Sequence, residues 1–148
     1  MIDEEKISKL KALELFESGV LDKMKPGTFE ALAKIHEKLF EGIFEFAGKI
    51  RHVNIAKGNF RFVPAIYLEA ALEKIEQMPQ SNFDEIIEKY VEMNVAHPFR
   101  EGNGRATRIW LDMILKSSLN KSYDYEDFSQ FNLRDLILET KNERSFYK

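Results

Sequence analysis

One twelve-residue segment contains the side chains best suited to chemistry. It reads His97-Pro98-Phe99-Arg100-Glu101-Gly102-Asn103-Gly104-Arg105-Ala106-Thr107-Arg108. Gly102, Asn103 and Gly104 are the residue types that most readily adopt positive φ. Such a loop can turn successive backbone N–H groups inward as an anion-binding nest. It also opens onto an expected helix, whose N-terminal N–H groups and dipole favour a phosphate, so the segment predicts a phosphate-binding loop.

The charged residues of this segment agree with a bound anion. The first turn of a helix normally prefers acidic side chains, yet here it carries Arg105 and Arg108, three apart and so on one face. The planar fork of arginine suits a polyphosphate because it can donate two hydrogen bonds at once. Glu101 would repel the same anion unless a divalent ion lay between them. Mg²⁺ is commonly held by one or two carboxylates plus phosphate oxygens, so Glu101 indicates a magnesium ligand.

His97 stands at the start of the segment, at the end of a helix and next to Pro98. The ordinary pKa of histidine, about 6.5, suits a general base at neutral pH. The loop contains neither Ser nor Cys, so a hydroxyl from another molecule is expected to attack phosphorus directly. We interpret Phe99 as an anchor that packs the loop onto the core. The segment as a whole predicts an enzyme that acts on a nucleotide.

The composition narrows the remaining classes of protein. The chain has 148 residues, 44% hydrophobic, with a formal net charge of −3 and no cysteine. That length fits one domain, and the missing cysteines exclude disulfides and thiolate metal sites. A general nucleic-acid binder would show a basic excess, which this chain lacks. With no apolar run near the ~18 residues that a membrane span needs and no signal peptide, we expect a cytoplasmic protein with no membrane partner.

The hydrophobic periodicity predicts mostly helices. Helices are expected over 5–18, 29–47, 68–75, 83–97, from 104 onward and over 131–143. Alternating apolar residues around Gly58 and Asn59 predict one β-hairpin, which Pro64 ends. The first helix is expected to turn Ile7, Leu10, Leu13 and Phe16 inward. His36 is expected in the core, and Glu85, Glu88 and Lys89 on a solvated face, which gives an all-α bundle interrupted by a hairpin.

The loop resembles the signature of the Fic family, His-Pro-Phe-x-(Asp/Glu)-Gly-Asn-Gly-Arg-x-x-Arg, and matches it at every specified position. Residues 27–40 and 46–51 look like the helix that precedes the Fic flap, and residues 54–62 look like the flap hairpin. The likeness covers about residues 10–118. It implies a Fic-type helical bundle with a single Fic domain over 1–148, a flap over about 50–63 and the signature loop over 97–108.

The resemblance further implies a transferase that moves AMP from ATP to a Ser, Thr or Tyr hydroxyl of a target protein and releases pyrophosphate. His97 would be the base and Glu101 the Mg²⁺ ligand. An anion hole of Gly102, Asn103 and Gly104 would surround the α-phosphate, and Arg105 and Arg108 would hold the outer phosphates. The flap, through Lys57, Gly58, Asn59 and Phe62, would bind the target as an added strand.

Three alternatives stay open at this stage. The related Doc kinases lack the second glycine of the loop, so Gly104 favours transfer of AMP over phosphate, but UMP or phosphocholine transfer is not excluded. A module that binds a peptide without chemistry is a second reading. Many Fic proteins carry an inhibitory (Ser/Thr)-x-x-x-Glu-(Gly/Asn) helix, and no such motif occurs here. The brake is then a separate antitoxin-like partner, or the enzyme is unrestrained, or a C-terminal tail was removed. The third alternative is therefore a toxin of a toxin–antitoxin pair that uses the same chemistry, and an antitoxin-like inhibitor and a homo-oligomer both stay open as partners.

Overall fold

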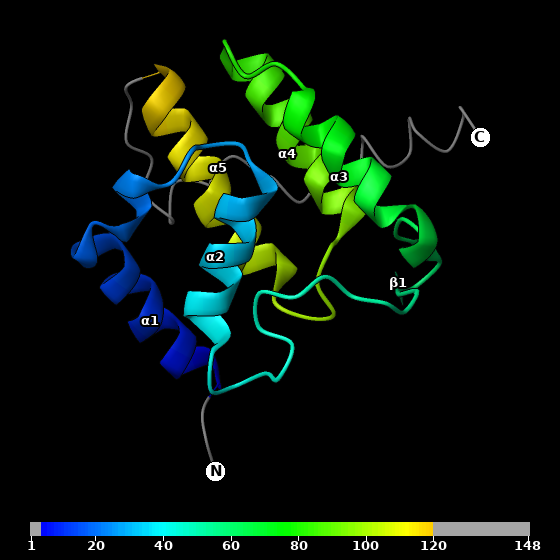
Figure 1. Ribbon diagram of the computed structural model, residues 1–148, viewed down its shortest axis with the longest axis horizontal. Coiled ribbons are helices and arrows are strands. Elements are labelled where there is room, and N and C mark those ends of the chain that lie inside the picture. The colour runs from blue at the N-terminus through cyan, green and yellow to red at the C-terminus, as the bar shows by residue number, and fades with distance from the viewer. Residues whose placement is uncertain (1–3, 120–148) are drawn as a thin grey trace.

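The computed structural model describes residues 4–119, which form six α- and 3₁₀-helices before the candidate loop, one helix after it, and a short hairpin at the edge of the bundle (Figure 1). The elements run in the order α1 Glu4–Ser18, η1 Val20–Lys23, α2 Phe29–Phe40, β1 Ala56–Lys57, β2 Phe60–Arg61, η2 Ala65–Tyr67, α3 Leu68–Gln77, α4 Phe83–Ala96 and α5 Asn103–Leu119. The predicted mostly helical bundle with one hairpin is confirmed. The helix expected over 131–143 lies outside the described residues.

Helix α5 forms the centre of the bundle. It packs against α2 and α4, while α1 covers α2 and α3 covers α4 (Figure 1). Trp110 of α5 is fully buried, and its Nε1 donates to the carbonyl of Thr28 at 2.9 Å. Thr28 in turn caps α2 through its side chain, as Asn82 caps α4. The candidate loop therefore joins two helices, α4 and α5, that are both anchored in the core.

Helix α2 is shorter than the sequence predicts. The apolar stripe suggested a helix to residue 47, but α2 ends at Phe40 and the chain continues in turns. Gly42 and Gly48 both adopt positive φ, 83° and 77°, which a continuing helix cannot accommodate. A Cβ on Gly48 would lie 2.8 Å from the Cβ of Glu37. The turns thus fold the chain back against α2, and only glycine permits that close approach.

The inward face of α1 was predicted wrongly. Leu10, Leu13 and Phe16 are 54%, 58% and 40% exposed, whereas Leu15 is 4% exposed and Ala12 packs on the core beside it. The apolar residues of this helix are spread around its circumference, so periodicity alone could not select the face that α2 covers.

Lys89 also departs from the sequence-based expectation, because it is buried rather than solvated. Its Nζ donates to the carbonyls of Glu76 and Met78, at 3.2 and 3.1 Å, and to Oε1 of Gln80 at 2.8 Å. Burial lowers the pKa of this ammonium. Lys89 therefore satisfies the carbonyls at the end of α3, where a cation is also favoured by the helix dipole.

Within residues 4–119, none of the helices combines the length and the apolar character required to cross a bilayer.

Candidate active site

His97 occupies an uncommon backbone conformation at the end of α4. It is the C-cap residue, with φ 52° and ψ 65°, and among the described residues it is the one non-glycine with positive φ. The following proline disfavours the helical region for the residue before it, so α4 stops where the sequence predicts. Histidine tolerates the left-handed region better than most residues. The backbone turn directs the His97 ring away from the axis of α4 and toward the flap.

Arg51 stabilises this turn through hydrogen bonds to backbone carbonyls. Its guanidinium is buried and donates four hydrogen bonds, from Nε to the carbonyl of His97 at 2.7 Å, from Nη1 to Val53 at 2.7 Å, and from Nη2 to Val63 at 2.6 Å and to Ala96 at 3.0 Å. Burial lowers the pKa of Arg51, but a guanidinium stays charged in proteins. The cation thus joins both ends of the flap to the negative end of α4.

The imidazole of His97 is oriented by two contacts. Its Nδ1 lies 3.2 Å from the carbonyl of Asn94. Because a carbonyl oxygen only accepts, Nδ1 carries the hydrogen, and in the neutral ring Nε2 carries the lone pair that a base requires. Phe62 stacks on one face of the imidazole, with the ring centroids 3.8 Å apart and the ring planes 12° from parallel. The flap and the candidate base are therefore in direct contact.

Phe99 anchors the loop, as the sequence predicts. It is fully buried and stacks on His36, with centroids 3.8 Å apart. The side chain of Asn103 closes the loop around it, since Oδ1 accepts from the N–H of Phe99 at 2.9 Å and Nδ2 donates to its carbonyl at 2.7 Å. The Asn103 side chain is thus engaged in holding the loop, and its backbone N–H is the group that lies at the start of α5.

His36 fixes the position of Glu101 from inside the core. Its Nε2 lies 2.8 Å from the carbonyl of Glu101, and its Nδ1 accepts from the N–H of Gly48 at 2.9 Å. Burial lowers the pKa of His36, partly opposed by the bond to Glu101. The ring is therefore a neutral Nε2–H tautomer. The Glu101 side chain is exposed while its backbone is held, so its carboxylate points away from the core.

Of the three loop residues expected at positive φ, only Gly102 adopts it, at 81°. A Cβ on Gly102 would lie 2.4 Å from Cε2 of Phe40, so any other residue would force the Phe40 ring to move. Asn103 and Gly104 instead form the first turn of α5. The nest expected over three residues is therefore one left-handed glycine followed by a helix N-terminus, whose first N–H groups lack intrahelical acceptors.

Gly104 differs from Gly102 because no side chain packs against it. A Cβ at this position would meet nothing within 4 Å, and the residue is exposed. Arg105 and Arg108 follow on α5 and are partly exposed. The structure thus places Glu101 directly before α5 and Gly104, Arg105 and Arg108 in the first two turns of that helix, with His97 six residues before its first residue. The space above Gly104 is open to a ligand.

The flap forms the predicted hairpin in a shorter version. Ala56 pairs with Arg61 and Lys57 with Phe60, and Gly58, at φ 60°, turns the chain together with Asn59. Lys57, Gly58 and Asn59 are exposed, whereas Phe62 is 6% exposed. Of the four flap residues singled out in the sequence, three thus face solvent, and Phe62 contacts His97.

Sequence reasoning missed two residues that shape the site. Arg51 was noted only as part of a likeness, and His36 only as a core histidine. An arginine a few residues before a hairpin gives no signal that it binds backbone carbonyls. His36 could have been suspected, because a histidine on an apolar helical stripe needs polar partners, but the sequence does not indicate that one partner is Glu101.

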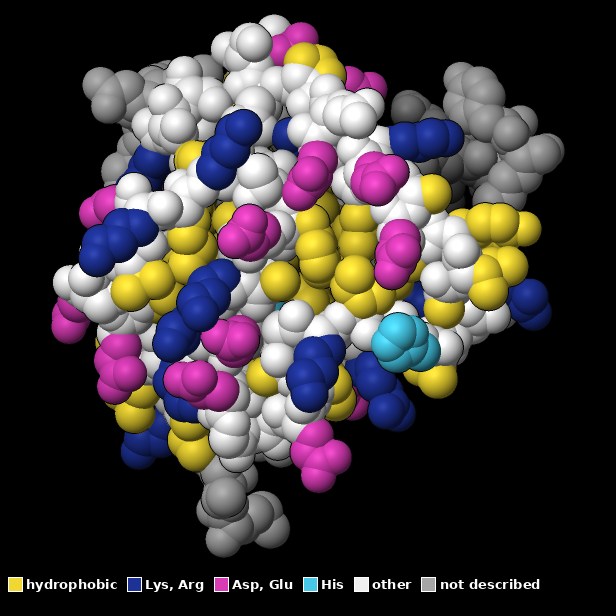
Figure 2. Space-filling model, in the orientation of Figure 1, with side chains coloured by type: hydrophobic (Ala, Val, Ile, Leu, Met, Phe, Trp, Pro, Cys, Tyr) yellow, Lys and Arg dark blue, Asp and Glu magenta, His cyan; other side chains and the backbone are white. Residues whose placement is uncertain are grey.

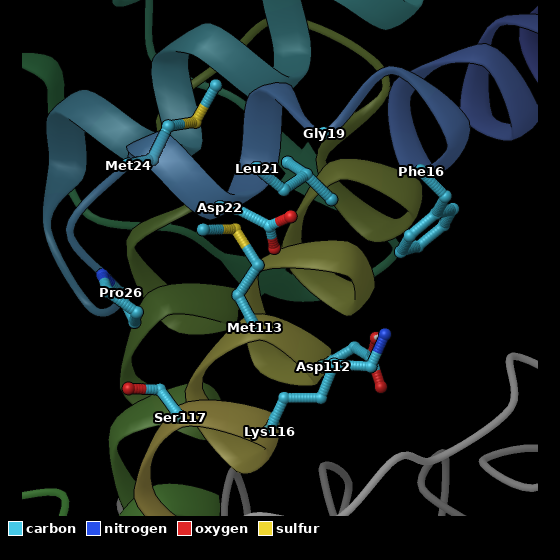
Figure 3. Close-up of a pocket in the computed structure, with 10 residues that line it drawn as sticks. All are labelled: Phe16, Gly19, Leu21, Asp22, Met24, Pro26, Asp112, Met113, Lys116 and Ser117. Carbon is cyan, nitrogen blue, oxygen red and sulfur yellow. Dashed lines mark ion pairs between the residues drawn. The ribbon is translucent and has the colours of Figure 1, made fainter.

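A hollow of about 370 Å³ lies elsewhere, between η1 and the C-terminal half of α5 (Figure 3). Leu21 and Met113 line its interior, and Asp22 and Asp112 add carboxylates. Asp112 lies eight residues beyond Gly104, which is about 12 Å along the helix. This hollow is therefore separate from the candidate loop. Among the described residues, no three His, Asp or Glu side chains gather as a metal-binding group.

Comparison with known proteins places the candidate loop in a family context. A model of the Fic/DOC family matches residues 26–115, more than half of the chain. The protein adenylyltransferase VbhT of Bartonella schoenbuchensis is 38% identical over 92 residues, which cover 53% of this chain and 19% of VbhT. A probable protein adenylyltransferase Fic of Salmonella typhimurium is 35% identical over 94 residues, which cover 56% of this chain and 47% of that protein. The chain spans less than half the length of these two relatives.

Solved structures support the fold. The type IV secretion system effector BepA matches 78% of this chain, and 47% of its own, at 23% identity with a TM-score of 0.66. BepC of Bartonella tribocorum, solved with bound AMPPNP, matches 85% of this chain and 74% of its own at 19% identity with a TM-score of 0.60. At these identities the likeness concerns the arrangement of the helices and the hairpin.

Proposed function

Because the chain belongs to the Fic/DOC family, we propose that it is a protein adenylyltransferase, which transfers AMP from ATP to a Ser, Thr or Tyr hydroxyl of a target protein. The observation that carries the proposal is the N-terminal end of α5. Its first two turns carry an open glycine and two arginines, an exposed carboxylate lies just before it, and a histidine held in the base tautomer precedes them. The names of the relatives support the same chemistry.

In the proposed reaction the target hydroxyl attacks the α-phosphorus of ATP. The bond from that phosphorus to the oxygen bridging the α- and β-phosphates breaks, and pyrophosphate leaves. The hydroxyl proton passes to Nε2 of His97, whose Nδ1–H donates to Asn94. Backbone N–H groups of Asn103 and Gly104 would stabilise the charge that develops on the α-phosphate oxygens. Arg105 and Arg108 would hold the β- and γ-phosphates.

Mg²⁺ fits this site as part of the substrate. The exposed Glu101 is a single carboxylate, which matches the usual pattern of one or two carboxylates completed by phosphate oxygens. Glu101 would hold the ion, which supplies positive charge beside the phosphates of ATP. The protein's own contribution is then to fix the Glu101 backbone through His36.

Gly104 supports AMP as the transferred group. Glycine at an exposed helical position costs ~0.5–1 kcal/mol relative to alanine, and no neighbour within 4 Å requires it here. A small residue is therefore explained by a ligand that approaches the backbone closely, as an α-phosphate does when the outer phosphates extend toward the arginines. In a kinase of this family type the γ-phosphate would take that place.

The test is incubation of the protein with Mg²⁺ and a bacterial lysate in parallel reactions with α-labelled and γ-labelled ATP. We expect α-label on protein and none from the γ-position, and His97→Ala abolishes the labelling. Label from the γ-position alone would replace the proposal by a kinase. Label that persists in His97→Ala would remove His97 as the base, and no nucleotide binding by calorimetry would favour the peptide-binding module.

Growth arrest tests a further reading, in which the chain is a toxin restrained by a partner chain. The motivation is that these 148 residues contain no (Ser/Thr)-x-x-x-Glu-(Gly/Asn) motif. Expression of the chain is expected to arrest growth, and Arg108→Ala is expected to relieve the arrest. Normal growth during expression of active, α-labelling protein would contradict the toxin reading.

A further inference from the structure

The segment around the flap contains no acidic residue. Between Glu45 and Glu69, residues 46–68 include four basic residues, Lys49, Arg51, Lys57 and Arg61, and neither Asp nor Glu. An even spread of the chain's 25 acidic residues over 148 positions would place about four in this stretch. In a protein with a net charge of −3, the flap is therefore a locally basic element.

Two of these basic side chains stand on opposite faces of the hairpin. Lys57 pairs with Phe60, and Arg61 pairs with Ala56. Cross-strand partners share a face and neighbouring positions alternate, so Lys57 and Arg61 point to different sides of the ribbon. Both are exposed, and within residues 4–119 neither makes an ion pair with a carboxylate. A strand added along the hairpin would therefore meet a positive charge on each of its two faces.

Large apolar side chains continue this basic element at its base. Ile66 is 83% exposed, Tyr67 61% and Val53 46%. The N–H of Ala65 donates to Oδ1 of Asn54 at 2.8 Å, which holds η2 against the foot of the hairpin. Figure 2 shows hydrophobic side chains gathered at the right-hand edge of the molecule, near the hairpin and η2, with a basic side chain beside them.

We call the combined area the flap surface, and it is formed by Val53, Lys57, Arg61, Ile66 and Tyr67. It is continuous with the candidate base. Phe62 follows Arg61 directly and stacks on His97, and the N–H of Val63 donates to the carbonyl of Val95 on α4 at 3.3 Å. A chain that lies on the flap surface would therefore reach His97 within a few residues.

We propose that the flap surface selects target proteins whose modified hydroxyl lies in an acidic segment that also carries a large apolar side chain. The proposal rests on the transferase function above and specifies its target class. A stretch with acidic residues at consecutive positions would place one carboxylate beside Lys57 and the next beside Arg61, while the apolar side chain covers Ile66 and Tyr67. ATP explains these residues less well, because Lys57 and Arg61 point to opposite faces and cannot both face the phosphates at α5.

The experiment uses matched pools of short fluorescein-labelled peptides with one central Tyr, Thr or Ser, flanked by Asp or by Lys, and with one Leu or Ser beside it. Binding is measured by fluorescence anisotropy on the His97→Ala protein, and AMP transfer with α-labelled ATP on the wild type. We expect the Asp pools to bind and react about three- to tenfold better than the Lys pools, since each exposed ion pair contributes up to about fivefold. Leu is expected to strengthen binding, and Ile66→Ser to remove that gain.

Lys57→Glu with Arg61→Glu is expected to abolish or invert the preference for Asp. The matched control, Lys25→Glu with Lys74→Glu, makes the same change in charge at two exposed positions outside the segment and should keep the preference. The thermal shift produced by ATP and Mg²⁺ should be the same in all these proteins, which shows that they fold and bind nucleotide.

The outcomes separate the two proposals. AMP transfer with no preference for Asp pools, or a preference that survives Lys57→Glu with Arg61→Glu, overturns the flap surface as a selector and leaves the transferase in place. Preferential binding of Asp pools without AMP transfer to any pool supports the flap surface and overturns the transferase. If no pool binds preferentially and no AMP is transferred, both proposals are overturned.

Discussion

Replacement of Arg51 by methionine removes four hydrogen bonds while it keeps most of the side-chain volume. At the lower limit of ~1.5 kcal/mol for a bond from a charged donor, four bonds amount to about 6 kcal/mol. Methionine also avoids the burial of a charge, which returns several kcal/mol. We therefore expect Arg51→Met to lower the free energy of unfolding by about 3–4 kcal/mol, a large part of the stability of a domain this size.

The measurement is urea unfolding followed by the fluorescence of Trp110, the single tryptophan, which is fully buried. Arg61→Met is the matched control, because this arginine is exposed on the hairpin and its loss is expected to cost less than ~0.5 kcal/mol. Arg51→Lys keeps the charge but lacks the planar fork, so its decrease in the free energy of unfolding should lie between those of Arg51→Met and Arg61→Met. A loss below ~1 kcal/mol for Arg51→Met, or one equal to that of Arg61→Met, would refute the bracing role of Arg51.

Further predictions concern the loop and the flap. Gly102→Ala is expected to lower the free energy of unfolding in urea by about 2–5 kcal/mol, because of the left-handed backbone and the clash with Phe40. Gly104→Ala should stay within ~1 kcal/mol of wild type and reduce the rate of AMP transfer more than tenfold. Equal stabilities of the two variants would contradict the packing argument. Burial lowers the pKa of His36 in the folded protein, so below pH ~6.5 the unfolded chain binds a proton at this residue that the folded state does not bind. The free energy of unfolding should therefore fall as the pH is lowered from ~6.5, and less steeply in His36→Gln. Parallel pH profiles of the two proteins would exclude His36 as the cause. Phe62→Ala should reduce the rate of AMP transfer more than the affinity for ATP measured by calorimetry, and an equal effect on both would argue against a role confined to the base and the target.

The sequence predicted the parts of the fold that depend on local patterns. Helices α2 and α4, which begin at Phe29 and Phe83, follow from their apolar stripes, and the end of α4 follows from Pro98. The hairpin follows from alternation around Gly58 and Asn59. These signals lie within a few residues of the feature they predict, so no knowledge of the tertiary structure is needed.

The errors arise where distant residues decide the outcome. Helix α2 ends at Phe40, and the turns after it bring the N–H of Gly48 to Nδ1 of His36, a contact that no stripe of apolar residues can indicate. Lys89 is buried because the carbonyls of α3, packed beside α4, need a donor. In α1, the position of α2 rather than the spacing of leucines selects the buried face.

The candidate site shows the same difference between what local patterns predict and what distant contacts decide. The types of residue in the loop indicate phosphate chemistry directly, and the structure brings these residues around one helix N-terminus. The support behind them, from Arg51 and His36, depends on hydrogen bonds between segments 46 and 65 residues apart in the chain. A motif therefore indicates which groups we propose to meet the substrate, whereas their positioning becomes visible only in three dimensions.

The left-handed backbone of His97 has a consequence for how this position can change during evolution. Asn, Asp and His are the non-glycine residues most often found at such a conformation, while most other side chains would strain the end of α4. Among the single-nucleotide changes of a histidine codon, those to Asn and Asp keep the backbone conformation and remove the imidazole. Descendants of such a protein that have abandoned catalysis but kept the fold are therefore expected to carry Asn or Asp at this position, with the surrounding loop intact.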